Sequence, residues 1–217
     1  MGRRFAEIAF TPLVKEQQTK HGSRRLYARA EQSPDSSDRL GPDEQEYIAS
    51  RDGFYMASVS ESGWPYIQYR GGQKGFLHII DDRTLGFADL RGNKQYISVG
   101  NLEHDDRVAL FLMDYAAQVR LKILGRAEIH ENDRAAEDWI AKLRMKGERT
   151  PAERAVLIHV EGFDWNCPQH ITPRFTEAEL TPMLEPIRKR LHDLEEENKR
   201  LRGELDKART DRVETAQ

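Results

Sequence analysis

The chain has 217 residues, enough for one sizeable domain with appendages. Hydrophobic residues make up 38% and charged residues 33%, the net charge is −3, and no long block of like charge indicates a nucleic-acid-binding surface. A single cysteine excludes an internal disulfide, and neither a signal-peptide pattern nor a membrane-length apolar run is present, so we expect a cytoplasmic protein without a membrane span.

Residues 1–42 are predicted to form an N-terminal segment and linker. A short helix is expected at Thr11–Lys20, and the polar stretch Glu31–Asp43, with its Ser and Pro residues, is typical of a surface linker. Pro42 suits the first turn of a helix, and the acidic residues that follow it would stabilise the N-terminus of that helix. We expect the helix to end near Ser50.

The pattern then changes to short β-strands separated by turn residues. The segment Trp64–Arg70 alternates, which would place Tyr66, Gln68 and Arg70 on one face of a strand. Short connections favour hairpins and a closed antiparallel sheet. The expected strands are Phe54–Ser60, Trp64–Arg70, Phe76–Asp81, Thr84–Asp89, Arg107–Asp114, Val119–His130 and Ala155–Trp165, with helices near Asn93–Asn101 and Asp133–Met145. Residues 43–176 are therefore predicted to form a mainly β domain, a barrel of about six antiparallel strands with peripheral helices.

Residues 177–217 have the pattern of a coiled-coil helix. Apolar residues spaced alternately by three and four occupy the a and d positions of about three heptads. The a positions are Leu184, Leu191, Asn198 and Leu205, and the d positions are Ile187, Leu194 and Leu201. A lone Asn at an a position favours a parallel pair of helices, and the flanking charges would attract across that pair: Arg190 with Glu195, Glu197 with Arg202, and Glu204 with Arg209. The alternative is a single amphipathic helix lying on its own barrel.

The stretch Asp164–Phe175, DWNCPQHITPRF, gathers side chains that stack, bind or react. A metal site is not favoured, because Cys167 and His170 are three apart but no second cysteine exists. A catalytic cysteine is not favoured either, because Pro168 lies between this pair and no third orienting group is evident. The remaining interpretations are one wall of a cofactor pocket, or a simple core in which Trp165 and the cysteine are buried.

A second candidate is the stretch ADLRGNKQYIS (Ala88–Ser98), which follows a strand and opens a helix. Gly92 allows a close approach of the backbone, and the helix N-terminus offers free N–H groups. Arg91 and Lys94 add positive charge, and Arg70 would supply a second cation from the preceding hairpin. This combination favours a phosphate site, with an ordinary basic surface loop as the alternative.

Together, the segments GWPYIQYRGG, FADLRGNKQYISVGNL, LFLMDY and DWNCPQHITPR resemble the pyridoxamine 5′-phosphate oxidase-related FMN-binding proteins, which have the flavin-binding split-barrel fold. The resemblance covers about Asp43–Phe175, and FTPLVKEQQTKHGSR, near the N-terminus, also resembles the family. The order of four motifs is specific, whereas each motif alone is not. The sequence is most similar to the branch that carries DWNCPQH, rather than to the true oxidases.

The resemblance implies FMN bound at a homodimer interface. The implied cofactor-binding residues are Tyr66, Ile67, Gln68, Arg70, Ala88, Asp89, Gly92, Asn93, Lys94, Gln118, Trp165 and Arg174. Backbone groups near Tyr66 and Ile67, together with Gln68, would face the flavin ring, which Ala88 and Asp89 would flank. Arg70 and Lys94 would hold the phosphate, helped by Gly92 and Asn93. Gln118 matches a glutamine that reaches the flavin in the true oxidases, and Trp165 and Arg174 match residues from the other subunit.

The sequence departs from the true oxidases at one substrate-binding element. Their Arg-x-His element corresponds here to PRF, so Phe175 replaces the histidine, and the RLHD at Arg190–Asp193 falls inside the predicted coiled coil. We therefore expect another substrate. Two classes of function remain: an FMN-dependent oxidoreductase that acts on an unknown small molecule and is reduced by NAD(P)H or another flavin, and a non-catalytic carrier or sensor. FAD and deazaflavin are the alternative cofactors.

Overall fold

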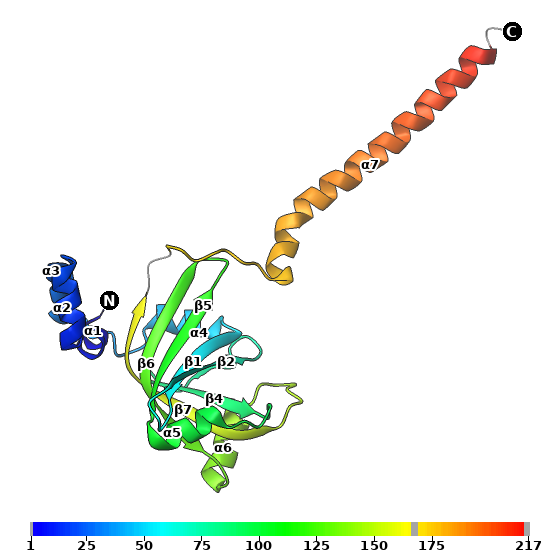
Figure 1. Cartoon of the computed structure of the whole chain (residues 1–217). Helices are drawn as coiled ribbons and strands as arrows, with labels where there is room; N and C mark the ends of the chain where they lie inside the picture. Colours follow the sequence, from blue (N-terminus) through cyan, green and yellow to red (C-terminus); the bar gives the residue numbers. More distant parts are fainter. Residues whose placement is uncertain (1, 166–168, 215–217) are drawn as a thin grey trace. The chain divides into compact units, whose positions relative to one another are not determined.

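The structure is a computed structural model that describes residues 2–165 and 169–214, with the side chains of the last six of these left out. The chain divides into two compact units, Met1–Thr172 and Pro173–Gln217 (Figure 1). Among the described residues, no helix has the length and apolar character that a membrane crossing requires. The predicted pocket-wall residues Cys167 and Pro168 lie outside the described residues.

The first unit is built on one antiparallel sheet of seven strands, in the order β2-β1-β5-β6-β7-β4-β3. The strands are β1 (Gly53–Val59), β2 (Pro65–Gly71), β3 (His78–Ile79), β4 (Thr84–Leu90), β5 (Arg107–Asp114), β6 (Val119–His130) and β7 (Ala152–Trp165). The predicted mainly β fold with peripheral helices is confirmed. The described strands number seven rather than about six, and the sheet is not closed, because β2 and β3 remain its edges.

One predicted strand is much shorter than expected. The sequence predicts a strand over Phe76–Asp81, whereas β3 contains only His78 and Ile79. Phe76 and Leu77 are consecutive and both buried, with 8% and 2% of their surface exposed. A strand points successive side chains to opposite faces, so this pair leaves the extended pattern to fill the core.

The core lies inside the curled sheet. Phe54 on β1 contacts Phe87 on β4, with ring centroids 5.6 Å apart, although β1 and β4 are not neighbours in the sheet. Phe76 contacts both rings at 5.7 and 6.5 Å. The sheet must therefore curl to bring distant strands together, which gives a split rather than a closed barrel.

Three short helices precede the sheet: α1 (Arg3–Ala9), α2 (Pro12–Lys20) and α3 (Arg24–Glu31) (Figure 1). Only α2 was expected from the sequence, where it was placed at Thr11–Lys20. Helix α1 is stabilised by contacts that a local pattern does not reveal. Ala6 is fully buried, and Arg4 forms an ion pair with Glu161 on β7 at 2.8 Å.

The remaining helices of this unit are α4 (Pro42–Ala49), α5 (Ile97–His104) and α6 (Arg134–Leu143). Helix α4 begins at Pro42 as the sequence predicts. Helix α5 begins four residues later than the expected Asn93, because Lys94 and Tyr96 have positive φ angles of 60° and 52°. Left-handed residues cannot continue a right-handed helix, so residues 92–96 form a loop. The second unit contains α7 (Glu177–Glu214).

The register of β6 against β7 predicts a stability effect at Gly125. The pairing shifts between Leu124 and Gly125, and a Cβ at Gly125 would lie 2.6 Å from the carbonyl oxygen of His159. We expect Gly125→Ala to lower the free energy of unfolding by about 1–3 kcal/mol, since backbone must move to relieve the clash. Urea unfolding followed by circular dichroism measures this.

The control is Gly100→Ala in helix α5, where no atom lies within 4 Å of the added Cβ. Helix propensity alone should then raise the free energy of unfolding by roughly 0.5–1 kcal/mol. Equal effects of the two substitutions would contradict the strand register described here.

Candidate functional site

Strand β2 presents two different faces. Tyr66, Gln68 and Arg70 line a cleft of about 240 Å³, whereas Ile67 and Tyr69 point to the opposite side and are 61% and 56% exposed. The alternation predicted for this strand is therefore confirmed. The cleft face carries polar and charged groups, and the other face is apolar.

The other walls of the cleft come from two parts of the chain, residues 89–99 and residues 153–154. Asp89 lies at the end of β4, Gly92, Asn93 and Lys94 follow in the loop, Ser98 lies in the first turn of α5, and Arg154 lies near the start of β7. Most of the implied cofactor-binding residues are thus brought together.

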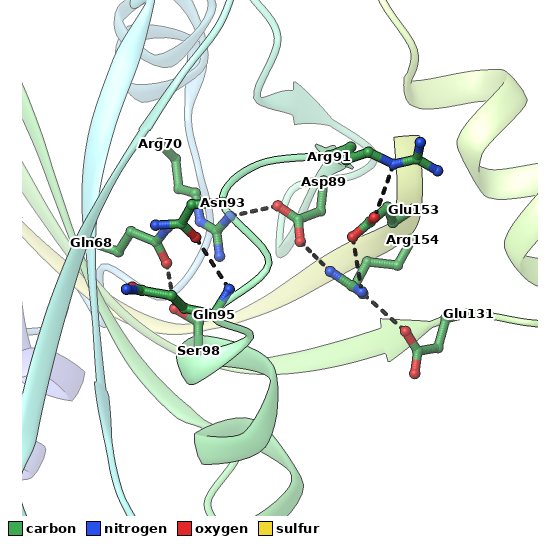
Figure 2. Close-up of polar contacts among 10 residues, drawn as sticks. All are labelled: Gln68, Arg70, Asp89, Arg91, Asn93, Gln95, Ser98, Glu131, Glu153 and Arg154. Atoms are coloured by element: carbon green, nitrogen blue, oxygen red, sulfur yellow. Dashed lines mark hydrogen bonds and ion pairs between the residues drawn. The ribbon is translucent and has the colours of Figure 1, made fainter. Parts of the chain in front are cut away.

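Asp89 is shared by two arginines. Nη1 of Arg70 donates to Oδ1 of Asp89 at 2.5 Å, and Nη1 of Arg154 donates to Oδ2 at 2.8 Å (Figure 2). The three side chains are only 15%, 7% and 9% exposed, in the order Arg70, Asp89, Arg154. Asp89 and Arg154 are partners in the β4–β7 ladder, but β2 is not a neighbour of β4. The ion pair to Arg70 therefore connects two strands that share no backbone hydrogen bonds.

Arg154 has further partners that fix its guanidinium. Its Nε donates to Glu131 at 2.9 Å (Figure 2), and its guanidinium carbon lies 5.3 Å from the ring centre of Tyr96. Burial lowers the pKa of Arg154, but the hydrogen bonds to Glu131 and Asp89 raise it, and the net effect is a pKa above the ordinary value. The Arg154 guanidinium therefore stays positively charged, and it lines the cleft.

Several donors in the cleft remain available. Nε of Arg70 is buried and has no hydrogen-bond partner among the described residues. Lys94 is exposed, and a Cβ at Gly92 would meet no atom within 4 Å, so the backbone there is open to approach. The charged side chains that line the cleft are the cations Arg70, Lys94 and Arg154 and the carboxylates Asp89 and Glu153. Positive charge exceeds negative charge, and an anion with several acceptor oxygens would suit these donors.

The loop that carries Lys94 is strained. Lys94 and Tyr96 both adopt left-handed backbone angles, which cost of order 1–3 kcal/mol for a non-glycine residue. Oδ1 of Asn93 accepts a hydrogen bond from the backbone N–H of Gln95 at 3.2 Å, which closes a turn around Lys94 (Figure 2). Backbone strain of this kind is typical of functional loops, and this loop contributes Lys94 to the cleft lining.

Ala88 and Gln118 lie elsewhere in the structure. Ala88 packs against the small apolar cluster of Leu143, Ala155 and Leu157, and it lines a neighbouring cavity of about 160 Å³ that shares Arg70, Asp89 and Leu90 with the cleft. Gln118 has a positive φ of 57° between β5 and β6, and its Nε2 donates to the carbonyl oxygen of Ile171 at 2.5 Å. The structure does not bring either residue to the cleft.

Trp165 and Arg174 also lie outside the cleft lining. Nε1 of Trp165 donates to Oε1 of Glu44 at 2.6 Å, and its ring meets Tyr47 edge-on at 4.8 Å. Burial raises the pKa of the Tyr47 hydroxyl to about 12, and that hydroxyl donates to the carbonyl oxygens of Leu112 and Val119. Arg174 belongs to the second unit.

Sequence reasoning did not select Ser98 or Arg154, whose polar contacts shape the cleft. Oγ of Ser98 donates to Oε1 of Gln68 at 2.9 Å, and Ser98 stood inside the predicted phosphate segment without being selected. No sequence pattern indicated Arg154, because its role depends on the β4–β7 register that places it opposite Asp89. Among residues 2–165 and 169–214, no group of three or more His, Cys, Asp or Glu side chains is placed to hold a metal ion.

A family model described as pyridoxamine 5′-phosphate oxidase matches residues 40–165, which is more than half of the chain. This range includes every residue that lines the cleft. No curated protein matches the chain in sequence.

Three solved structures are similar to the chain. A Lactobacillus delbrueckii protein, provisionally assigned as a pyridoxamine 5′-phosphate oxidase, is 21% identical, with 58% of this chain and 94% of that chain covered and a TM-score of 0.46. HupZ of Group A Streptococcus is 18% identical, with 63% and 99% covered and a TM-score of 0.45. An F420 reductase is 18% identical, with 57% and 98% covered and a TM-score of 0.41.

The partners of Arg154 predict its effect on stability. We expect Arg154→Met to lower the free energy of unfolding by about 3 kcal/mol, because Asp89 and Glu131 would each lose a partner at a mostly buried position. Urea denaturation provides the measurement. The matched control is Arg91→Met: Arg91 is 53% exposed and pairs with Glu153 at 3.2 Å, so its loss should cost about 0–1 kcal/mol. Indistinguishable results for the two variants would contradict the assigned contacts.

Proposed function

Because the chain belongs to the pyridoxamine 5′-phosphate oxidase family, whose members generally bind flavin, we propose that it is an FMN-binding oxidoreductase that acts on a small molecule. The observation that carries the proposal is the polar cleft along β2, where Tyr66, Gln68 and Arg70 face the loop that holds Lys94. Three cations, Arg70, Lys94 and Arg154, line this cleft together with the neutral polar side chains of Tyr66 and Gln68.

We assign the FMN phosphate to the cations Arg70 and Lys94 in the cleft lining. Nε of Arg70 is a buried donor without a partner among the described residues, and the exposed Lys94, in the strained loop, lines the same cleft. Gly92 leaves room for a close approach, and Asn93 lines the same wall. Asp89 accepts hydrogen bonds from both Arg70 and Arg154. One carboxylate thus positions Arg70, while the two arginines together keep a net positive charge.

The flavin ring is assigned to the β2 side of the cleft, near Tyr66 and Gln68. Ser98 donates to the amide oxygen of Gln68, which leaves the amide N–H groups of Gln68 as donors. Donors of this kind near a flavin ring favour its reduced, anionic form. FMN supplies the redox chemistry by accepting two electrons from a donor and passing them to an acceptor, while the protein supplies position and electrostatics.

We also propose that the protein is a homodimer. The outer face of β2, β1 and β5 is apolar, with Tyr69, Tyr55 and Phe111 aligned in one row across the three strands. The rings of Tyr55 and Tyr69 are 5.4 Å apart, and Tyr69 is more than half exposed. An exposed apolar face of this kind is suited to burial against a second copy. Gln118 and Trp165, which do not line the cleft of their own chain, and Arg174 of the second unit would then reach the flavin from the partner.

The substrate is proposed to differ from that of the true oxidases. Phe175 stands where their substrate-binding element has a histidine, and its side chain is 45% exposed. A phenyl ring cannot donate a hydrogen bond or carry charge, so it cannot replace an imidazole in binding a phosphorylated vitamin.

The phosphate assignment predicts the effect of two substitutions on FMN affinity. Arg70→Ala and Lys94→Ala should each weaken binding by about tenfold or more, because each removes a charge-assisted hydrogen bond worth roughly 1.5–3 kcal/mol. Fluorescence quenching of FMN on titration with protein measures the affinity. Arg91→Ala is the matched control, because this cation lies in the same loop but outside the cleft lining. A double variant of Arg70 and Lys94 with wild-type affinity would overturn the assignment, provided that urea denaturation shows it folded.

The oxidoreductase part of the proposal predicts that a nicotinamide donor reduces the bound flavin. Under anaerobic conditions, the flavin absorbance of the FMN-loaded protein should bleach on addition of NADPH or NADH and return on admission of air. Flavin that stays oxidised with both donors would argue against a nicotinamide-dependent reductase and favour a carrier or sensor.

A further inference from the structure

Helix α7 is one continuous helix of 38 residues with an exposed apolar seam. The seam residues are 39–64% exposed and recur at alternating spacings of three and four: Leu184, Ile187, Leu191, Leu194, Leu201 and Leu205. A helix of this length with a narrow apolar stripe is stabilised mainly by burying that stripe. We propose that α7 pairs with α7 of a second copy of this chain, as a parallel, in-register, two-stranded coiled coil.

Two prolines fix where the regular pairing begins. Pro182 and Pro186 lie inside α7, at heptad positions f and c, which face away from the seam. A proline inside a helix removes one backbone hydrogen bond and bends the helix. The regular seam therefore starts at Ile187 and continues to Leu205.

Asn198 sets the orientation of the pair. It is the one polar residue at an a position between Ile187 and Leu205. In a parallel, in-register pair it faces its own copy, and the two amides can hydrogen-bond to each other. In an antiparallel pair, a positions face d positions, so the amide would be buried against leucine or isoleucine without a partner. The parallel arrangement is the one that satisfies Asn198.

The flanking charges agree with the same register. Position g of one helix faces position e of the next heptad on its partner, which pairs Arg190 with Glu195 and Glu197 with Arg202. Each pair occurs twice by symmetry. Glu204 also contacts Arg200 of its own helix, at 3.6 Å. All these side chains are exposed, so they select the partner and the register, whereas burial of the leucine seam provides the stability.

Disulfide crosslinking in the full-length chain tests this pairing. In a Cys167→Ser background, Leu191→Cys and Leu205→Cys each place one cysteine at an a position, where the two helices approach closely. Both variants should form covalent dimers under mild oxidation, seen on a non-reducing denaturing gel. Glu196→Cys is the control at position f, which points away from the partner, and it should crosslink at least fivefold more slowly.

Two outcomes would overturn the proposal. Equal crosslinking of all three variants would mean that the tails meet at random. No crosslinking at Leu191→Cys and Leu205→Cys would mean that the helix lies on its own barrel or pairs in antiparallel.

Charge reversal gives a second test that keeps the seam intact. In the Leu191→Cys background, Glu197→Lys should slow crosslinking several-fold, because it would face Arg202 of the partner, and Arg202→Glu should do the same. The two changes together restore opposite charges and should return the rate to within twofold of the parent. Single changes without effect, or a double variant as slow as the singles, would overturn the register. Neither test involves FMN, so its outcome is independent of the proposed flavin site.

Discussion

The cleft depends on one carboxylate that two arginines share. Asp89 accepts hydrogen bonds from Arg70 on the edge strand β2 and from Arg154 on β7, and all three side chains are largely removed from solvent. Burying charges costs several kcal/mol per ion, which the attraction between them offsets only with good geometry. Such an arrangement is weak as a source of stability, but it holds β2 at a fixed distance from β4 where no backbone hydrogen bond does so. The opening of the split barrel is thereby kept at a defined width.

The loop after β4 adds the second constraint. Left-handed angles at Lys94 and Tyr96 delay the start of α5, and the residues left outside the helix line the same cleft as Arg70. A regular helix starting at Asn93 would be less strained, but it would turn these groups along the helix surface. The strained loop therefore places the exposed Lys94 in the lining of the same cleft as the mostly buried Arg70. This combination of a buried and an exposed cation is well suited to a phosphate.

Much of the fold follows from local pattern. Alternation and turn residues predict the approximate positions of six of the seven described strands, and they predict which side of β2 carries Tyr66, Gln68 and Arg70, because these signals lie within a few residues of one another. The length of β3 was predicted wrongly, because the consecutive residues Phe76 and Leu77 are both buried in the core and so do not alternate as strand residues do. Helices α1 and α3 were not predicted either, because α1 is stabilised by a contact with the distant Glu161 and α3 by packing against α1 and α2.

The site was predictable only in part, for a related reason. Arg70 and Asp89 were both selected from the sequence, but their contact was not foreseen, since the strands that carry them are not adjacent in the sheet. Arg154 was missed, because its partner is set by the register of β4 against β7. Gln118, Trp165 and Arg174 stay predictions, because their proposed contacts need a second copy of the chain.

The central claim is that this cleft retains FMN, and gel filtration after loading tests it most directly. The purified full-length protein would be mixed with excess FMN, passed through a desalting column, and its absorbance spectrum recorded. Our account predicts flavin bands that co-elute with the protein and differ in shape from those of free FMN. Flavin that elutes entirely with the small molecules, from protein shown to be folded, would contradict it.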